Sequence, residues 1–377
     1  MKESLRICLF AGTFLPKIGG SELSLHYLAK GFQKQGHFPV VLTLSKKGDM
    51  SLWDISYPVQ RYTRFRALYL LAEKYRRPFD ILYVNGIYPC GYVAARLRKI
   101  LNVPIVVSCP GDDIQIIPEI GYGKRLNPKI DRRIRWTVGE VDALFAIVAS
   151  FHQELQSLGA STDKLFDVPH GSDSTQFQGI PSIRTLFSIP PDCRILLLIG
   201  RNHVKKGYPD FIRAMPEIVQ RYPKVRAIIV GKNTEQLLPL VNEMKVKEQV
   251  ILSPPFTWNE YRRLLVGSDI YVTPSLGEGF SLALADAMAA GIPQVAFDVE
   301  GCRDVIRNNE TGLIVPKQDA KALANAVVTL LENVNLYRQL SEGSRQTARS
   351  FDWDIIVDRH LEIYQRLVEI HQEKKTR

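Results

Sequence analysis

The stretch DIYVTPSLGEGFSLALADAMAAGIPQVAFD (269–298) predicts a complete strand–turn–helix–strand unit. DIYVTP is a short apolar run typical of a buried strand, and SLGEG is a glycine-rich turn. FSLALADAMAAG predicts a helix that Gly291 and Pro293 end, and PQVAFD predicts a second buried strand. A buried strand that leads through a helix to another buried strand is typical of a parallel sheet covered by helices.

The same alternation of short apolar runs and longer helical patterns occurs twice along the chain. Strands are predicted at 6–10, 39–44, 80–84, 104–109 and 142–148, and again at 194–200, 226–231, 249–253, 269–274 and 293–298. A helix and a further short strand are expected within 301–319. The proline-broken, polar segment between the two sets (172–193) is typical of a linker. The predicted fold is therefore α/β, with two facing Rossmann-like domains, each a doubly wound parallel sheet that binds ligands at the carboxyl ends of its strands.

We expect the first domain at 1–175 and the second at 190–355. The amphipathic pattern at the end of the chain predicts a long helix that packs across the domain boundary and, from about 356 to 377, joins the first domain. A length of 377 residues agrees with two domains, and 45 % apolar and 23 % charged residues are typical of a globular chain and not of a disordered one.

The opening residues lack the apolar run of a signal peptide, and no apolar stretch approaches the roughly 20 residues that span a bilayer. The five cysteines are widely spaced without CxxC pairs, which favours free thiols in a reducing compartment over disulfides or zinc. We therefore expect a cytoplasmic protein.

Positive charge is concentrated in the first half of the chain. Residues 1–170 hold 23 Lys and Arg against 15 Asp and Glu, whereas 171–377 hold 26 against 24. The densest basic runs are 61–79 and 124–136, and each is either a solvated helix face or a surface for anionic lipid or an acidic substrate. Nucleic acid is not expected as a partner, since no nucleic-acid-binding motif accompanies the charge.

Two carboxylates in the 269–298 stretch are candidate ligand-binding groups. Glu278 lies in the turn, where it can accept hydrogen bonds from a polyhydroxyl ligand, and Asp286 lies farther along the predicted helix. The backbone amides at the start of that helix form a candidate anion site, contributed by Gly279, Phe280, Ser281 and Leu282. A diphosphate between two sugars would use both carboxylates; the alternative is an ordinary turn with Asp286 as a satisfied core acid.

This segment resembles the E-x7-E region of the family 4 retaining glycosyltransferases, the glycosyl transferases group 1, which have the GT-B fold. Asp286 stands where the family usually has its second glutamate, and Ser281 stands where many relatives have glycine. The resemblance extends over nearly the whole chain. It implies that Glu278 holds the donor sugar and that Asp286 binds the ribose of the donor nucleotide.

A second matching motif is IGRNHVKKGYPDFIRA (199–214). The resemblance implies that Arg201 and Lys206 grip the diphosphate of the donor. Fixed cations in a desolvated site would stabilise the negative charge that gathers on the departing diphosphate in the transition state. Taken alone, this motif is equally typical of a basic surface turn.

The segment FAGTFLPKIGGSELSLHYLAKGFQKQGH (10–37) matches the P-x-x-G-G-x-E opening of the same family. Gly19 and Gly20 would let the backbone approach a phosphate or sugar at the start of a helix, while Glu22 favours the positive helix end. The G-x-G-x-x-G fingerprint of dinucleotide-binding enzymes is absent from this turn, which argues against a nicotinamide-dependent dehydrogenase.

Two further segments of the first half contain candidate residues. In VVSCPGDDIQ (106–115), Pro110 stands where many relatives have a histidine, and Asp113 or Asp112 either orients the acceptor hydroxyl or caps a helix. VPHGSD (168–173) resembles the family's turn between domains, and its His170 either faces the cleft or is structural.

No metal site is expected. The sole Asp-x-Asp triplet is Asp352–Asp354, just before the last predicted helix, where a helix cap is the simpler interpretation. No cluster of His, Cys and carboxylate residues has zinc spacing. We expect no cofactor besides the co-substrate, a nucleotide diphosphate-sugar with UDP or GDP.

Together these features predict a retaining, metal-independent glycosyltransferase that moves a sugar from a nucleotide diphosphate-sugar to a glycan or lipid-linked acceptor in polysaccharide or glycoconjugate synthesis. The basic first domain suggests peripheral contact with anionic lipid at the inner face of the cell membrane. The base is expected near 254–261 and the acceptor near 61–71. A non-catalytic sugar-nucleotide-binding module and an epimerase of the same fold remain the alternatives.

Overall fold

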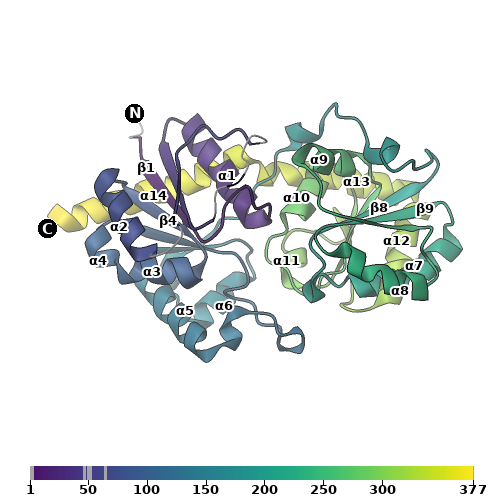
Figure 1. Cartoon of the computed structure of the whole chain (residues 1–377), viewed down its shortest axis with the longest axis horizontal. Coiled ribbons are helices and arrows are strands. Elements are labelled where there is room, and N and C mark those ends of the chain that lie inside the picture. The colour runs from purple at the N-terminus through teal and green to yellow at the C-terminus, as the bar shows by residue number, and fades with distance from the viewer. Residues whose placement is uncertain (1–3, 46–47, 49–52, 63–65, 377) are drawn as a thin grey trace. The chain divides into compact units, whose positions relative to one another are not determined.

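The computed structural model describes residues 4–45, 48, 53–62 and 66–376. The chain forms two compact units: Met1–Gly171 together with Trp353–Arg377, and Ser172–Asp352. In Figure 1 the yellow C-terminal helix lies with the purple and blue elements of the first unit. The first unit is therefore built from both ends of the chain.

The first unit contains a seven-stranded parallel sheet in the order β3-β2-β1-β4-β5-β6-β7. Chain order reverses direction between β1 and β4, which makes that pair the switch point of the sheet. Its strands are β1 (Arg6–Ala11), β2 (Phe38–Thr43), β3 (Val59–Arg61), β4 (Ile81–Asn85), β5 (Ile105–Cys109), β6 (Ala143–Ala146) and β7 (Leu165–Asp167).

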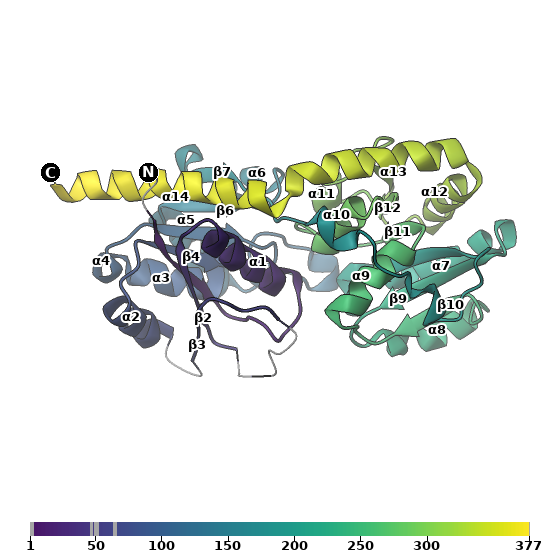
Figure 2. The same ribbon diagram turned by 90° about the horizontal axis from the view of Figure 1, so that it is seen from above.

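Helices cover this sheet, as its nearly continuous apolar strands require. They are α1 (Gly20–Lys34), α2 (Arg66–Arg76), α3 (Tyr92–Arg96), α4 (Arg98–Leu101), α5 (Pro128–Glu140), α6 (Phe151–Ser157) and α14 (Trp353–Thr376). Helix α14 packs against α1, and Figure 2 shows it running along the first unit. Its Tyr364 is fully buried, with ring centroids 5.7 Å from Phe32 and 6.1 Å from Phe145. The C-terminal helix thus completes the core of the first unit.

The second unit contains a six-stranded parallel sheet in the order β10-β9-β8-β11-β12-β13. Here chain order reverses between β8 and β11. The strands are β8 (Arg194–Ile199), β9 (Val225–Val230), β10 (Val250–Ser253), β11 (Ile270–Thr273), β12 (Gln294–Phe297) and β13 (Gly312–Val315). Its α-helices are α7 (Tyr208–Arg221), α8 (Leu238–Glu243), α9 (Trp258–Gly267), α10 (Leu282–Ala289), α11 (Glu300–Arg303), α12 (Ala320–Glu332) and α13 (Val334–Ala348).

The predicted α/β class with two doubly wound parallel sheets is confirmed. Two three-residue edge strands, β3 and β7, escaped the sequence analysis because they lack an apolar run of their own. The segment 172–193 is not a free linker: Phe177, Ile183 and Ile189 are buried, and two short 3-10 turns of this segment pack on α9. Within the basic run 61–79 and the predicted acceptor region 61–71, positions 63–65 lie outside the described residues.

We predict that Tyr364→Ala destabilises the first unit by roughly 3–5 kcal/mol, because it deletes a large, fully buried aromatic ring and leaves a cavity. Ile370→Ala, on the exposed part of the same helix, is the control and should cost well under 1 kcal/mol. Chemical denaturation measures both. Equal, small losses would show that α14 does not complete this core.

Candidate functional site

The loops that follow β8 and β11 meet at the switch point of the second sheet. The amide of Leu276 donates to the carbonyl oxygen of Lys205 at 2.7 Å. Gly207 has φ +62°, and a Cβ there would collide with the carbonyl oxygen of Pro274. Only glycine satisfies both constraints, so Gly207 lets the loop after β8 pack directly on the backbone that leaves β11. In open α/β sheets this crevice is where ligands bind.

Glu278 is buried at this junction, with 6 % of its surface exposed. Its carboxylate forms a close ion pair with Lys206, lies 3.8 Å from the amine of Lys205 and accepts a hydrogen bond from Ser275 Oγ at 3.0 Å. Burial alone would raise the pKa of Glu278, but the two lysines and Ser275 outweigh burial and lower it to about 2. Glu278 is therefore an ionised acceptor at every physiological pH.

Positive charge gathers around the same loop. Arg201 is exposed and forms no ion pair with an acid in the part of the chain that the structure describes. Burial, and then the charges of Arg201, Lys205 and Lys206, lower the pKa of His203. The three cations themselves give this loop a positive local potential, which suits a polyanionic ligand such as a diphosphate.

The start of α10 supplies the backbone amides predicted for an anion site. Ser281 is the N-cap and has an extended backbone (φ −86°, ψ 107°), without a side-chain hydrogen bond to the helix. The amides that follow it thus have no side-chain cap, and serine replaces glycine here without backbone strain. A Cβ on Gly301 would collide with the carbonyl oxygen of Gly279, so α11 packs tightly against the loop that carries Glu278.

Phe280 and Leu282 flank this helix start and are each 9 % exposed. The Phe280 ring packs edge-on against Phe351, with centroids 5.4 Å apart. Apolar packing on both sides of the N-cap fixes where the amides point, which a preorganised anion site requires.

Asp286 is buried within α10, and hydroxyl groups donate to both of its carboxylate oxygens. Ser172 Oγ donates to Oδ1 at 2.5 Å and the Tyr261 hydroxyl donates to Oδ2 at 2.7 Å. Burial raises the pKa of Asp286 to about 6, against the lowering effect of these two hydrogen bonds. The carboxylate is thus ionised at pH 7 but balanced by hydroxyls and not by cations.

The first unit brings its own candidates to the switch point between β1 and β4. Gly19 is the N-cap of α1, and the Glu22 carboxylate folds back toward it at the positive end of the helix. Gly20 opens the helix and is exposed. Asn85, at the end of β4, donates to the carbonyl oxygen of Ser21 at 3.5 Å, so the two loops lie side by side.

Asp113 has no exposed surface. It accepts hydrogen bonds from the Ile87 amide at 2.6 Å and from Lys124 Nζ at 2.8 Å, and Lys124 also pairs with the half-exposed Asp112 at 3.1 Å. Burial raises the pKa of Asp113 to about 6 even though Lys124 opposes it. Residues 112–114 form a turn, and the next helix is a short 3-10 turn, Pro118–Ile120, with Ile117 as its N-cap, so the alternative that these aspartates cap a helix is wrong. Asp113 fixes the loop after β4, and its contact with an acceptor hydroxyl stays a prediction.

His170 is buried, and its Nδ1 lies 2.7 Å from Ser24 Oγ of α1. Burial lowers the pKa of His170 to about 4, so the imidazole is neutral at pH 7. His170 thus connects the end of the segment Met1–Gly171 to helix α1. A role for His170 in binding a ligand stays a prediction.

Two family models match consecutive parts of the chain. The model described as Glycosyltransferase Family 4 matches residues 18–176, and the model described as Glycosyl transferases group 1 matches residues 193–333. The chain belongs to the family 4 glycosyltransferases of the GT-B fold.

Similar members of this group agree with that placement. A D-inositol 3-phosphate glycosyltransferase of Xylanimonas cellulosilytica is 28 % identical over 59 % of this chain and 57 % of its own length. A phosphatidyl-myo-inositol mannosyltransferase of Mycobacterium leprae is 28 % identical over 56 % of this chain and 55 % of its own length. The matches therefore span little more than half of each relative.

The crystal structure of Anabaena HepE in complex with UDP-glucose has a TM-score of 0.83. It is 18 % identical, with coverage of 96 % of this chain and 100 % of that one. At this identity the likeness establishes the GT-B fold alone.

In this family 4 glycosyltransferase, sequence reasoning missed four residues that hold the site together: Lys205, Ser275, Ser172 and Tyr261. All four lie within stretches that the sequence analysis singled out. Their contacts join positions up to 114 residues apart, and no local pattern reports such pairings.

No group of three or more His, Cys, Asp or Glu side chains within 4–45, 48, 53–62 and 66–376 is placed to hold a metal ion. In the same part of this glycosyltransferase, every helix is too short or too polar to cross a membrane.

The two carboxylates of the site should affect stability in opposite directions. The folded-state pKa of Asp286 lies above its unfolded value of 3.8, so its contribution to stability falls as pH rises through about 4 to 6. Asp286→Asn removes the burial cost of the charge, and we expect up to about 3 kcal/mol of added stability at pH 8 and little change near pH 4.

Glu278 has a folded-state pKa below its unfolded value of 4.5, so its stabilisation is complete above that pH and is lost as pH falls toward 2. Glu278→Gln should therefore destabilise the second unit at pH 8, by about 3 kcal/mol. Denaturation of both variants at the two pH values measures the contrast. Shifts of the same sign at pH 8 would contradict these charge assignments.

Proposed function

We propose that this chain is a retaining, metal-independent glycosyltransferase that transfers a sugar from a nucleotide diphosphate-sugar to a glycan or lipid-linked acceptor. Polysaccharide or glycoconjugate synthesis is the process that such a reaction serves. The observation that carries the proposal is the pairing of Glu278 with Lys206 at the switch point of the second sheet, beside the exposed Arg201 and the uncapped start of α10.

The donor class is supported by the chemistry of this loop cluster. Three cations and free helix amides suit a diphosphate, while ionised carboxylates suit sugar hydroxyls. The GT-B neighbour from Anabaena is titled as a complex with UDP-glucose, and the sequence relatives are named for transfer to inositol-containing acceptors. The UDP-glucose complex of that neighbour supports a nucleotide-sugar donor here, and we expect UDP or GDP as its nucleotide.

In the proposed reaction Arg201 and Lys206 bind the diphosphate, Glu278 binds hydroxyls of the donor sugar, and Asp286 binds the ribose. Lys206 must then turn from Glu278 toward the phosphate oxygens. That exchange frees the Glu278 carboxylate to accept hydrogen bonds from the sugar hydroxyls. One movement of Lys206 therefore prepares both the sugar side and the diphosphate side of the bond that breaks. Because charge accumulates on the diphosphate as the bond breaks, the cations stabilise the transition state more than the bound donor.

Retention of configuration follows if the acceptor hydroxyl enters on the face that the diphosphate leaves. The bond from the anomeric carbon to the diphosphate oxygen breaks, the bond to the acceptor oxygen forms, and a diphosphate oxygen takes the acceptor proton. This route needs no separate general base. In the first unit, the buried side chains of His170 and Asp113 are already engaged, with Ser24 and Lys124 respectively.

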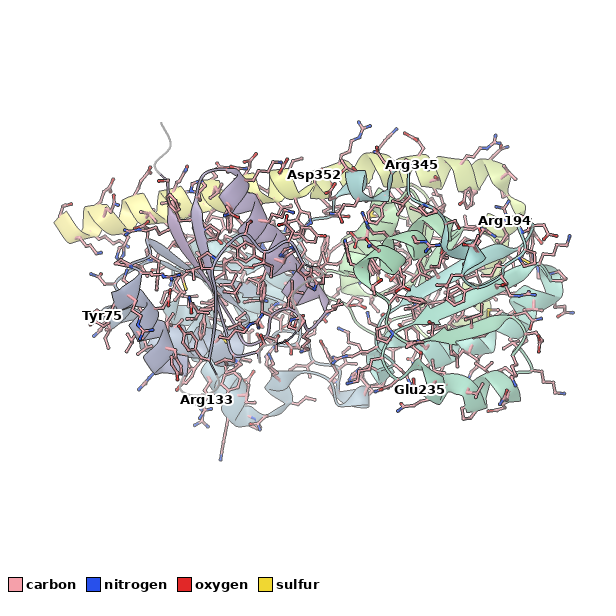
Figure 3. All side chains as sticks on the ribbon, turned by 45° about the horizontal axis from the view of Figure 1, so that its top comes forward. Tyr75, Arg133, Arg194, Glu235, Arg345 and Asp352 are labelled. Carbon is pink, nitrogen blue, oxygen red and sulfur yellow. The ribbon has the colours of Figure 1, made fainter. Side chains whose placement is uncertain are left out.

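An anionic acceptor or membrane surface is supported by a row of aromatic and basic side chains on α3, α5 and the turn after β4. The Arg133 guanidinium lies 5.4 Å from the ring centre of Tyr92 and 5.8 Å from that of Tyr88, and Arg96 lies 5.8 Å from Trp136. Trp136 is 37 % exposed, and Figure 3 shows Arg133 at the surface of the first unit.

These arginines differ from their neighbours in charge pairing. Arg98 pairs with Glu140 at 3.2 Å and with Asp142 at 3.6 Å, whereas neither Arg96 nor Arg133 pairs with an acid among the residues that the structure describes. Aromatic rings next to unneutralised guanidinium groups are typical of surfaces that contact lipid headgroups. We propose peripheral contact with anionic lipid at the inner face of the membrane through this row.

We predict that Lys206→Ala and Arg201→Ala each lower the turnover number by about 100- to 1000-fold, as the loss of one donor to a developing oxyanion does. Arg213→Ala, which removes an exposed ion pair on α7, should leave the rate unchanged. Release of nucleoside diphosphate from UDP-, GDP- and ADP-sugars in the presence of an acceptor extract, with and without EDTA, measures the effect.

Near-normal turnover of both variants would contradict these roles. Binding of a nucleotide-sugar without any release, in the wild-type chain, would favour a non-catalytic binding module. Release that needs no acceptor would favour an epimerase.

For the lipid surface, we predict that the chain floats with phosphatidylcholine vesicles containing phosphatidylglycerol and that salt abolishes this binding. Arg96→Ala and Arg133→Ala should each weaken partitioning about fivefold, at about 1 kcal/mol per basic residue. Arg98→Ala, already neutralised by two acids, is the matched control and should change little. Flotation equal to that on pure phosphatidylcholine would refute lipid contact through this row.

A further inference from the structure

The hydrogen bonds to Asp286 point to two residues that no motif assigns. We propose that Ser172 and Tyr261 are positioning residues that hold the Asp286 carboxylate in the orientation that receives the ribose of the donor nucleotide. This inference rests on the proposed function and adds the parts of the site that orient the nucleotide. The evidence is the arrangement of three side chains from separate elements of the second unit.

The position of Ser172 is fixed by its own backbone. Its amide donates to the carbonyl oxygen of Phe351 at 2.7 Å, and residue 172 pairs with Asp352 in a short parallel bridge. These are the two places where the chain passes between its compact units. With 2 % of its surface exposed, Ser172 has little freedom, and its hydroxyl meets Oδ1 of Asp286 at 2.5 Å.

Tyr261 is held by its helix and by a ring stack. It lies on α9, whose start is secured by a capping box between Thr257 and Glu260. Its ring stacks on that of Trp258, with centroids 5.0 Å apart and planes 18° apart. The hydroxyl is thereby carried on a rigid ring to Oδ2 of Asp286, at 2.7 Å. Removing only the hydroxyl of Tyr261 therefore tests its hydrogen bond to Asp286 and leaves the ring stack on Trp258 in place.

The two hydroxyls leave acceptor capacity on the carboxylate for further donors. An ionised carboxylate offers about four acceptor positions, and these donors occupy one on each oxygen. One further position on each oxygen remains, which matches the paired hydroxyls of a ribose diol. A carboxylate clamped from both sides does not need to be ordered when the nucleotide arrives, so less rotamer entropy opposes binding.

The clamp also accounts for an aspartate at a position where the resemblance implies glutamate. The aspartate side chain is one methylene shorter, and the hydroxyls reach into the site from α9 and from residue 172 to fix it. Burial and the nearby Asp173 both favour the protonated form of Asp286. The two hydroxyls oppose this effect because their hydrogen bonds stabilise the ionised carboxylate. The charge of Asp286 also interacts with the buried Tyr271, in addition to Tyr261 and Asp173.

The experiment compares Ser172→Ala and Tyr261→Phe with two controls of the same chemistry. Ser344→Ala removes a buried serine hydroxyl that bonds the carbonyl oxygen of Thr311, and Tyr337→Phe removes a tyrosine hydroxyl of α13. Calorimetric titration with UDP and GDP between pH 5.5 and 8 gives the dissociation constant and its pH midpoint, within roughly the range where Asp286 titrates. Thermal unfolding of each variant verifies that it is folded.

We expect each positioning variant to bind the nucleotide about tenfold more weakly at pH 7.5, as loss of a hydrogen bond to a charged group does. The pH midpoint of binding should rise, because fewer donors stabilise the ionised form. In turnover assays the KM for the donor should increase while kcat changes little, since the ribose is remote from the reacting bond. Both controls should match the wild type.

Unchanged affinity together with an unchanged pH midpoint in both positioning variants would overturn this inference while leaving donor binding intact. If the wild-type chain binds neither UDP nor GDP, the proposed function fails for these donors and the inference fails with it. Weaker binding without a shift in the midpoint would assign the two hydroxyls to folding of the site and would also overturn their positioning role.

Discussion

Glu278 is a carboxylate with almost no contact with water, and it remains charged because two lysines and a serine surround it. These partners come from the loops after β8 and β11, which adjoin because chain order reverses between those strands. Gly207 permits the backbone contact that brings the loops together. The topology of the sheet therefore creates the crevice, and one ion pair holds its two sides in register.

Within the second unit the site uses two different means to keep carboxylates ionised. Glu278 is balanced by cations, so its charge stabilises the fold; Asp286 is balanced by hydroxyls, so its charge costs stability at neutral pH. Binding sites often retain groups that the fold would be more stable without. A buried carboxylate that is hydrogen-bonded but not neutralised keeps its ability to accept hydrogen bonds from a neutral diol, whereas a paired lysine would compete with that ligand.

Much of the fold was legible in the sequence because strands buried on both faces leave unbroken apolar runs. β8, β11 and β12 were predicted within one or two residues, whereas the three-residue strands β3 and β7 carry no such run. For the site, the sequence indicated Lys206, Glu278 and Asp286 through motifs.

The sequence could not indicate that Ser172 and Tyr261 meet Asp286, because that contact depends on packing between distant segments. It also could not tell that Asp113 is fully enclosed, since burial depends on Lys124 and on the loop after β4. Ser281 departs from the family pattern without backbone strain, because its backbone is extended and does not require glycine.

The most direct test is a crystal structure of the protein with the nucleoside diphosphate that raises its melting temperature most among UDP, GDP and ADP. The account predicts the diphosphate within hydrogen-bond distance of Arg201 and Lys206, beside the first amides of α10, with the ribose on Asp286. A nucleotide bound elsewhere on the second unit, with Lys206 still paired to Glu278, would contradict it.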